Sequence, residues 1–427
     1  MADILREVVA RNRAGQRAAI PSVCSAHPDV LRASLELARD LGQAVVIEAT
    51  SNQVNQDGGY TGMRPEDFVR FVRGIAQEVA IDPALVLLGG DHLGPQAWRR
   101  GDAATAMAKA HRMVADYAAA GFTKIHLDCS EGCAGEPAQL PDAVCAARAA
   151  ELAESALDAA PDPARLILVV GTEVPPPGGA RTDDHGDIPP TTPEAARATL
   201  QAHQAAFSAR ALAQVAGLVV QPGVEFSPME VHRLPMARDP GLRAVLDDWP
   251  GLCLEAHSTD YQHPAVYPRL AELGFAFQKV GPALTFAWRQ AVYALDLLRG
   301  LAGWQTGPAL PEVMERLMLA APGNWQGHYH GGDLRLARHF GLADRIRYYW
   351  PQPEAQAAVA GLFADLAGQA LPAPLLEQVF APDIIAVAVA AAGEDALPQA
   401  LVRAQVQAAL RPYFLDSPTP NGKEPRP

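Results

Sequence analysis

Acidic and histidine side chains in this sequence recur directly after short apolar runs. Asp91 and His92 follow ALVLLGG, and His126 and Asp128 close the run TKIHLD. Carboxylates and imidazoles exchange protons near neutral pH, and together they suit borderline divalent ions such as Zn²⁺, Mn²⁺ or Co²⁺. Because a charged group removed from water is costly unless it is paired or metal-bound, such a group of residues indicates catalysis or cation binding.

The same pattern continues along the chain, so that polar residues accompany most of the apolar runs. The further members of this group are Glu48, Asn52, Gln53, Glu131, Glu173, Glu225, Glu255, His257 and Lys279. Side chains two residues apart on a strand point to the same face. This spacing therefore pairs His126 with Asp128, and Glu255 with His257.

The adjacent residues Asp91 and His92 form the centre of the predicted site. An acid and an imidazole straight after an apolar strand are hard to explain by packing alone. Glu173 and Glu225 are less specific signals, since each could equally be an ordinary polar residue of a loop. No phosphate-binding P-loop and no G-x-S-x-G nucleophile motif is present in the sequence.

Eight short β-rich runs are expected to position these side chains. Their ranges are 19–23, 44–49, 84–90, 123–128, 165–171, 217–221, 252–256 and 275–280. Amphipathic stretches lie between them, and Gly42 and Gly121 are typical helix ends. The alternation predicts an α/β fold, a TIM (β/α)8 barrel, in which all C-terminal strand ends share one rim. A doubly wound open sheet is the alternative, but no G-x-G-x-x-G opens the chain.

The strand signal ends after Arg299, and the remaining sequence is helical in character. We expect a barrel over residues 1–300 and a helical C-terminal extension, packed on the barrel, over 301–415. Residues 416–427 are polar and proline-rich, so this tail is predicted to be disordered.

The predicted extension contains a short cationic and aromatic segment, ADRIRYYWPQP (343–353). The guanidinium groups of Arg345 and Arg347 could bind a phosphate or stack on a sugar. The aromatic residues of this segment could instead anchor the extension to the barrel. Both interpretations remain open for the segment as a whole.

Composition excludes several classes of partner. The net charge of −13 argues against a nucleic-acid binder, and no apolar run is long enough to span a membrane. The charged N-terminus lacks the apolar core of a signal peptide. Five cysteines at irregular spacing fit reduced thiols, so we expect a cytoplasmic protein.

Several long motifs also identify a family that this chain resembles. They are IPSVCSAHPDVLRASLELA, EATSNQVNQDGGYTGM, GGDHLGPQAWR, KIHLDCSEGC, GTEVPPPGG, EAHSTDYQ and DRIRYYWP. With them the chain resembles the Z-subunit family of tagatose-bisphosphate aldolases (GatZ/KbaZ type), from about Ile20 to Pro351. The resemblance implies a fold similar to the class II aldolases, which are zinc-dependent barrels.

The resemblance also implies roles for individual residues. The implied metal ligands, for Zn²⁺ or else Mn²⁺ or Co²⁺, are His92, Glu225 and His257, with Glu255 as the alternative to His257. The candidate catalytic carboxylates are Asp91, Asp128 and Glu173. The candidate substrate-binding residues are Glu48, Asn52, Gln53, His126, Lys279, Arg345 and Arg347.

The function implied is a metal-dependent carbohydrate enzyme acting on ketohexoses by reversible C3–C4 retro-aldol chemistry. We favour a 4-epimerase that interconverts fructose- and tagatose-type sugars; the alternative is a non-catalytic subunit that supports a tagatose-bisphosphate aldolase. The expected partner is a small sugar or sugar phosphate, with a homo-oligomer or an aldolase catalytic subunit as further partners. The glycine-rich phosphate loop of the aldolases is replaced here by STDYQ (258–262), which argues against their mode of phosphate binding.

Overall fold

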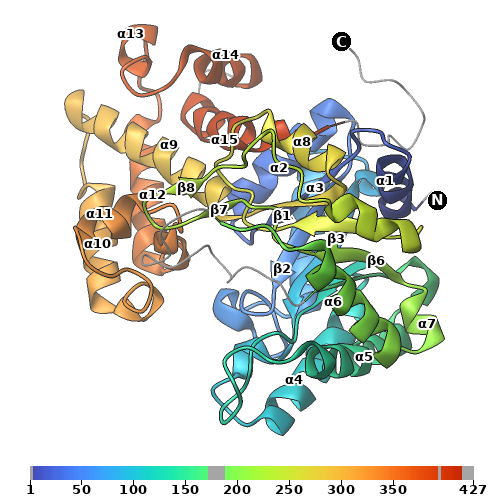
Figure 1. Cartoon of the computed structure of the whole chain (residues 1–427). Coiled ribbons are helices and arrows are strands. Elements are labelled where there is room, and N and C mark those ends of the chain that lie inside the picture. The colour runs from blue at the N-terminus through green and yellow to red at the C-terminus, as the bar shows by residue number, and fades with distance from the viewer. Residues whose placement is uncertain (1–2, 172–187, 393–395, 416–427) are drawn as a thin grey trace.

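Eight parallel strands close into a barrel in the computed structural model, which describes residues 3–171, 188–392 and 396–415 (Figure 1). The strands are β1 (Ile20–Cys24), β2 (Val45–Thr50), β3 (Val86–Leu93), β4 (Lys124–Leu127), β5 (Ile167–Val170), β6 (Val215–Val219), β9 (Cys253–Ala256) and β10 (Phe275–Val280). Each strand pairs with the next, and β10 pairs with β1 to close the barrel. The predicted fold class is confirmed, and all eight predicted strands are present within a few residues of their expected bounds.

The strands form because their sequences are apolar enough to be covered on both faces. Every residue of β5 (ILVV) and of β10 (FAFQKV) is buried, as expected for parallel strands between a packed barrel interior and an outer layer of helices. The charged residues among them face the barrel interior, where they form the ionic network described below.

Helices cover the outside of the barrel and build the C-terminal extension. The α-helices are α1 (Ile4–Arg13), α2 (Pro28–Leu41), α3 (Pro65–Glu78), α4 (Ala103–Ala120), α5 (Asp142–Ala159), α6 (Pro193–Ala206), α7 (Ala209–Leu212), α8 (Val266–Glu272), α9 (Pro282–Leu301), α10 (Leu310–Ala320), α11 (Leu334–Phe340), α12 (Pro353–Leu366), α13 (Ala373–Leu376), α14 (Pro382–Ala391) and α15 (Leu397–Leu410). The caps of α2 and α4, Gly42 and Gly121, adopt the left-handed conformation, with φ of 63° and 97°. These two predicted helix ends are therefore confirmed.

The extension begins after α9 and contains only helices and turns within its described residues (Figure 1). Its last helix, α15, packs against α9 and α2, so the extension returns to the barrel wall. Arg299, which is buried, joins the two parts: it pairs with Asp296 at 2.7 Å and with Asp365 of α12 at 2.6 Å. The predicted disordered tail, 416–427, lies outside the described residues.

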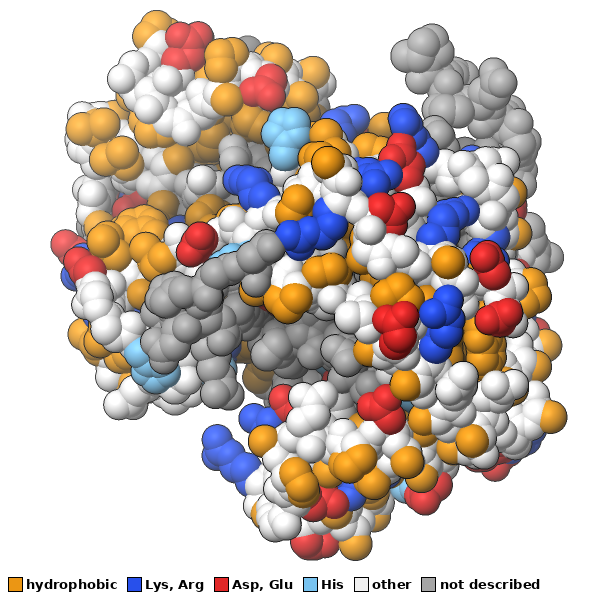
Figure 2. All heavy atoms as spheres, in the orientation of Figure 1, with side chains coloured by type: hydrophobic (Ala, Val, Ile, Leu, Met, Phe, Trp, Pro, Cys, Tyr) orange, Lys and Arg blue, Asp and Glu red, His pale blue; other side chains and the backbone are white. Residues whose placement is uncertain are grey.

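The extension also exposes large apolar side chains, and Figure 2 shows hydrophobic atoms gathered on this part of the surface. These side chains are Leu319, Leu336, Phe340, Val387 and Val389, together with Leu297 and Leu301 at the end of the adjoining α9. Exposed apolar surface of this kind can support self-association, so the predicted homo-oligomer stays a prediction. Within the described ranges, no helix is both long and apolar enough to cross a membrane.

Candidate active site

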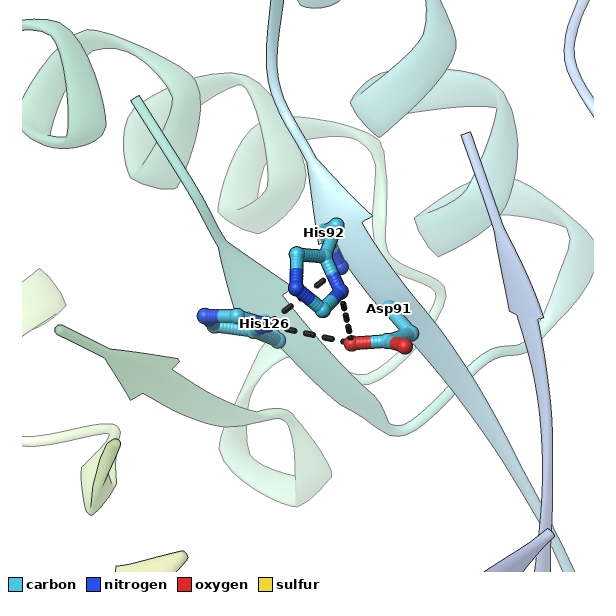
Figure 3. A group of neighbouring side chains, drawn as sticks. All are labelled: Asp91, His92 and His126. Atoms are coloured by element: carbon cyan, nitrogen blue, oxygen red, sulfur yellow. Dashed lines mark hydrogen bonds and ion pairs between the residues drawn. The ribbon is translucent and has the colours of Figure 1, made fainter. Parts of the chain in front are cut away.

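The end of β3 departs from regular strand geometry, and this departure positions the centre of the site. His92 has φ of 49°, and the pairing of β3 with β4 shifts register between Gly90 and Leu93. In a regular strand, Asp91 and His92 would point to opposite faces. The irregular backbone instead brings the two side chains together, with His92 Nδ1 2.7 Å from Asp91 Oδ1 (Figure 3).

Three imidazole rings meet at this point, one from each of three strand ends. His92 lies near the end of β3, His126 lies in β4, and His257 directly follows β9. Their ring centroids are 5.0 Å, 5.0 Å and 5.2 Å apart, so the rings form a nearly equilateral triangle. The triangle is buried, since none of the three residues is more than 6% exposed.

Each ring is oriented by a carboxylate. Asp91 Oδ1 contacts Nδ1 of both His92 and His126, the latter at 3.2 Å (Figure 3). Glu255 Oε1 lies 2.8 Å from Nε2 of His257. A carboxylate on one ring nitrogen fixes the tautomer and leaves the other nitrogen free to bind a metal, as in many metal sites.

The donor atoms fit a divalent metal ion. The Nε2 atoms of His92 and His126 are buried and have no hydrogen-bond partner among the described residues, which is unusual for a polar atom in a protein interior. Two groups of potential ligand atoms, each within 4.8 Å of one another, overlap at His126. These groups are Asp91, His92 and His126, and His126, Glu255 and His257.

A fully buried ionic network lies beneath the imidazoles. Lys124 Nζ is 2.6 Å from both Glu48 Oε1 and Glu255 Oε2. Lys279 Nζ is 2.8 Å from Glu48 Oε2 and also contacts Asp91. Two lysines therefore share three carboxylates, and the pairs compensate the cost of removing these charges from water.

This network keeps two of its carboxylates, Asp91 and Glu255, ionised. Burial alone would raise the pKa of Asp91, but His92 and Lys279 hold that pKa well below its ordinary value. Burial opposes ionisation of Glu255 in the same way, and Lys124 and Lys279 hold its pKa well below the ordinary value. Both groups can therefore accept protons or hydrogen bonds throughout the neutral pH range.

The histidines differ in protonation. Burial lowers the pKa of His126, and burial together with the charge of Lys279 lowers the pKa of His257 well below its usual value. Burial also acts on His92, but Asp91 outweighs it and raises that pKa. The lowered pKa values favour neutral rings at His126 and His257, and a neutral ring offers the lone pair required of a metal ligand.

Two glycines make room for these contacts. A Cβ atom at Gly89 of β3 would lie 2.7 Å from Cγ of Glu48, so a larger residue would push that carboxylate out of the network. A Cβ atom at Gly94 would lie 1.7 Å from the carbonyl oxygen of Asp128. The close approach of the Glu48 side chain explains Gly89, and that of the Asp128 backbone explains Gly94.

A cavity of about 500 Å³ opens above the imidazoles. Its walls come from both parts of the molecule: strand ends and loops of the barrel on one side, and residues 347–363 of the extension on the other. The predicted site residues that line it are Asn52, Gln53, Asp91, His92, His257, Lys279 and Arg347. The extension therefore completes the site as well as covering the barrel.

Other predicted site residues do not line the cavity. Glu48 and His126 lie beneath it, and Asp128 is buried, where its Oδ1 accepts hydrogen bonds from Ser130 N and Oγ at 3.0 and 2.7 Å. Glu225 lies in β7 (Glu225–Phe226), a two-residue strand paired with β8 (Val231–His232), and belongs to none of the ligand groups found among the described residues. Glu173 lies outside the described residues.

Arg345 also lies away from the cavity lining, although its side chain is buried. Its Nε donates to the carbonyl oxygen of Asn324, and its guanidinium lies 5.1 Å from the ring centroid of Tyr348. The two arginines predicted together thus have different environments, and only Arg347 reaches the cavity. A role of Arg345 in binding substrate stays a prediction.

Sequence reasoning overlooked several residues of the site. Lys124 is the second residue of TKIHLD, and a lysine at the start of a predicted buried strand was the available signal. Cys24 Sγ lies 3.3 Å from Glu48 Oε2 and 3.4 Å from Asp91 Oδ2 at the cavity wall. Tyr60 and Asp260 also line the cavity, but they occur in loops, where no periodic pattern marks them.

The fold and the site together define a TIM barrel with a buried histidine–carboxylate–lysine centre at its C-terminal rim. The chain belongs to the D-tagatose-1,6-bisphosphate aldolase subunit GatZ/KbaZ-like family, which it matches over residues 5–417. The family resemblance drawn from the sequence motifs is therefore confirmed.

Two relatives match nearly the whole chain. A D-tagatose 6-phosphate 4-epimerase from Agrobacterium fabrum is 48% identical over 424 residues, covering 97% of this chain and 98% of the relative. A crystal structure of a probable tagatose 6-phosphate kinase from Sinorhizobium meliloti 1021 is 47% identical, with a TM-score of 0.83. That alignment covers 92% of this chain and 99% of the solved one, so it supports the arrangement of barrel and extension together.

Proposed function

We propose that this protein is a metal-dependent 4-epimerase of ketohexose 6-phosphates, interconverting tagatose- and fructose-type sugars. The observation that carries the proposal is the pair of unpartnered Nε2 atoms of His92 and His126 beside an ionised Asp91, beneath a cavity of sugar size. The similarity to a D-tagatose 6-phosphate 4-epimerase over nearly the full chain supports the substrate class.

A divalent ion fits among the three imidazoles. In this proposal His92, His126 and His257 hold the ion, so His126 takes the place that sequence comparison assigned to Glu225. Zn²⁺, Mn²⁺ or Co²⁺ suits neutral imidazole ligands. When bound, such an ion supplies Lewis-acid polarisation of the ketose oxygens at C2 and C3.

The residues of the chain would move the proton that the reaction requires. Asp91 lines the cavity as an ionised carboxylate, so it can accept the proton of the C4 hydroxyl as the C3–C4 bond breaks. The bond electrons then pass to the three-carbon fragment as an enediolate, and C4 becomes an aldehyde. Rotation of the aldehyde, bond formation on its other face and return of the proton from Asp91 complete the epimerisation.

Other cavity residues would bind and orient the sugar. Lys279 can donate hydrogen bonds to the oxygen atoms that gain negative charge, and its position between Asp91 and Glu48 holds it in place. Asn52 and Gln53 offer amide groups to the hydroxyls of the sugar. Rotating the aldehyde requires room, and the cavity provides it.

The second candidate is a supporting subunit of a tagatose-bisphosphate aldolase, which the description of the family favours. The buried network opposes this view, because a non-catalytic subunit gains no stability from unpartnered imidazole nitrogens and buried charges. A direct assay decides between the two candidates.

The test incubates the purified, metal-loaded protein alone with D-tagatose 6-phosphate in D₂O, followed by NMR analysis of the products. Retro-aldol epimerisation yields D-fructose 6-phosphate that retains the original hydrogen at C4. Deuterium at C4 would contradict the bond-cleavage route, and deuterium at C3 with a C3-inverted product would indicate 3-epimerisation. No turnover of phosphorylated or free ketohexoses unless an aldolase subunit is added would replace the proposal with the supporting role.

A further inference from the structure

The cavity has a second polar region, on the wall formed where the extension meets the loop after β2. Arg347 and Tyr348 belong to the short 3-10 helix Arg345–Tyr348 of the extension, and Tyr60 belongs to the loop. The rings of Tyr60 and Tyr348 contact edge to face, with centroids 5.0 Å apart. The Arg347 guanidinium lies 4.5 Å from the centroid of the Tyr348 ring.

The positive charge of this wall is only partly offset, because the carboxylates of Asp344 and Asp260 act on Arg347 at longer range and neither forms an ion pair with it. Arg347 donates from Nη1 to the carbonyl oxygens of Ala343 and Asp344 and from Nη2 to the hydroxyl of Tyr348, at 2.9 Å for the last contact. None of these partners carries a negative charge, and among the described residues no carboxylate forms an ion pair with Arg347 or Arg345. A guanidinium has five N–H donors, so donors remain for an anion.

A buried contact with α9 holds this arginine in place. Asp344 adopts a left-handed backbone conformation with φ of 45° at the start of the 3-10 helix. Its side chain accepts hydrogen bonds from Thr285 Oγ1 at 2.6 Å and Arg289 Nε at 3.0 Å. The strained residue is thus fixed by α9 of the barrel, and Arg347, three residues later, is directed to the cavity.

The usual anion-binding position of a TIM barrel is filled by the protein itself. In this fold a phosphate commonly binds near the last two strands, at a helix N-terminus. Here Asp260, after β9, accepts the backbone N–H groups of Gly281 and Ala283 at 3.1 and 2.8 Å, at the N-terminus of α9. Because the next residue is Pro282, which has no N–H, this carboxylate occupies the first available donors.

The other helix N-terminus at the cavity is also occupied. His27, Pro28 and Asp29 at the start of α2 line the cavity, and Asp29 carries a carboxylate that accepts the indole N–H of Trp288 at 2.9 Å. Negative charge at both helix ends would repel a phosphate. Arg347, which forms no ion pair among the described residues, is the position that attracts one.

We infer that the phosphate monoester of the substrate binds at Arg347, between Tyr60 and Tyr348, and not at the N-terminus of α9. This inference rests on the proposed function and adds to it the position of the phosphate group. The extension then provides selectivity for phosphorylated sugars, while the barrel carries out the reaction at the opposite end of the substrate.

The test compares Arg347→Met with wild type on D-tagatose 6-phosphate and on D-tagatose. We expect KM for the phosphorylated sugar to rise about 10- to 100-fold, the usual value of a charge-assisted pair, with less than about threefold change for the free sugar. A second readout is the Kd of D-glucitol 6-phosphate, which lacks a carbonyl group and cannot react, measured by thermal shift. That Kd should rise by the same factor.

Two further variants complete the design. Arg335→Met removes a positive charge from the same extension at an exposed position outside the cavity, and it should leave both constants unchanged. Arg347→Lys keeps the charge but loses the planar fork, so KM and Kd for the phosphorylated sugars should rise about three- to tenfold. This variant provides the test if Arg347→Met does not fold.

The outcomes separate this inference from the proposed function. If wild-type protein binds D-glucitol 6-phosphate through Arg347 but turns over no sugar, the proposed function is contradicted and the phosphate site is supported. An active enzyme whose KM and Kd are unchanged in both Arg347 variants would overturn the phosphate site alone. Equal weakening of phosphorylated and free sugars would assign Arg347 to packing of the cavity wall, which also contradicts the inference.

Discussion

Two regions of the site differ in how they carry charge: the buried ionic network, here called the floor, and the cavity wall formed by the extension, here called the wall. The floor combines Asp91, Glu48 and Glu255 with Lys124 and Lys279, so that each buried charge faces an opposite one. The wall presents arginines whose partners are neutral phenol rings and backbone carbonyls. The floor is therefore built to hold its charges without a ligand, and the wall retains charge for one.

This difference has consequences for stability and for function. A compensated network in the barrel interior cannot lose a member without leaving an unpaired buried charge, so its residues affect folding as well as chemistry. A cation at the edge of the cavity can be removed at small cost, because solvent and neutral partners surround it. Catalysis and ligand selection are thus assigned to parts of the molecule with different tolerance to mutation.

The largest expected effect is removal of the proposed metal ion from the floor. Turnover should fall below detection after dialysis against a chelator and return with Zn²⁺, Mn²⁺ or Co²⁺, since the proposed ion would polarise the reacting oxygens. His126→Ala should lose bound metal in elemental analysis. His203→Ala, which alters a buried histidine of α6 outside the cavity, is the control and should retain it. Full activity in protein shown to be metal-free would contradict the assignment.

Asp91→Asn should have the next largest effect, on rate. The substitution keeps the size of the side chain but removes the proton acceptor, so kcat should fall by about two to four powers of ten. Asp116→Asn, on the surface of α4, where Asp116 pairs with Arg112 at 2.7 Å, is the matched control. Steady-state kinetics with metal content measured in parallel would check this. A normal kcat in the Asp91 variant would exclude it as the base.

Lys124→Met tests the compensated network through stability. The variant removes one of the two lysines that Glu48 and Glu255 share, so the free energy of unfolding should fall by roughly 3–5 kcal/mol. Lys109→Met removes an exposed lysine that pairs with Asp57, and it should cost about 1 kcal/mol or less. Urea unfolding of the two variants makes the comparison. Equal, small losses would show that the buried network contributes little.

The smallest expected effect concerns Asp260 and depends on pH. Burial raises the pKa of Asp260 from 3.8 to about 6, against the hydrogen bonds from Ala283 and Gly281. A raised pKa favours the protonated folded state, so this stability is fully present below about pH 4 and is lost as pH rises through about 6. Asp260→Asn cannot ionise, so it does not lose this stability. Over that interval its free energy of unfolding should rise relative to that of wild type, by at most roughly 3 kcal/mol. Parallel curves of unfolding free energy against pH would contradict the shift.

Much of the fold could be predicted because its signals are local. Apolar runs with glycine-ended helices between them specify a strand and a helix wherever they occur, and the barrel then brings every C-terminal strand end to one rim. For this reason the neighbourhood of Asp91, His92, His257 and Lys279 followed from the sequence. The resemblance to a family indicated the chemistry expected at that rim.

Contacts between side chains were decided by tertiary structure, since register and backbone conformation set them. The register shift and positive φ at the end of β3 place His92 beside His126 and make His126 a candidate ligand rather than only a substrate contact. Glu225 lies in the hairpin of β7 and β8 and belongs to none of the ligand groups of the described residues. Neither feature leaves a periodic trace in the sequence.

The two arginines of the extension show the same difference between what the sequence predicts and what the tertiary structure decides. The sequence alone determined that two guanidiniums and several aromatic rings lie close together in residues 343–353. Only the packing of Asp344 against Thr285 and Arg289 of α9 decided that Arg347 lines the cavity and Arg345 does not. Residue type and spacing are properties of the chain, whereas the direction of a side chain depends on partners about 55 residues away, which no local pattern encodes.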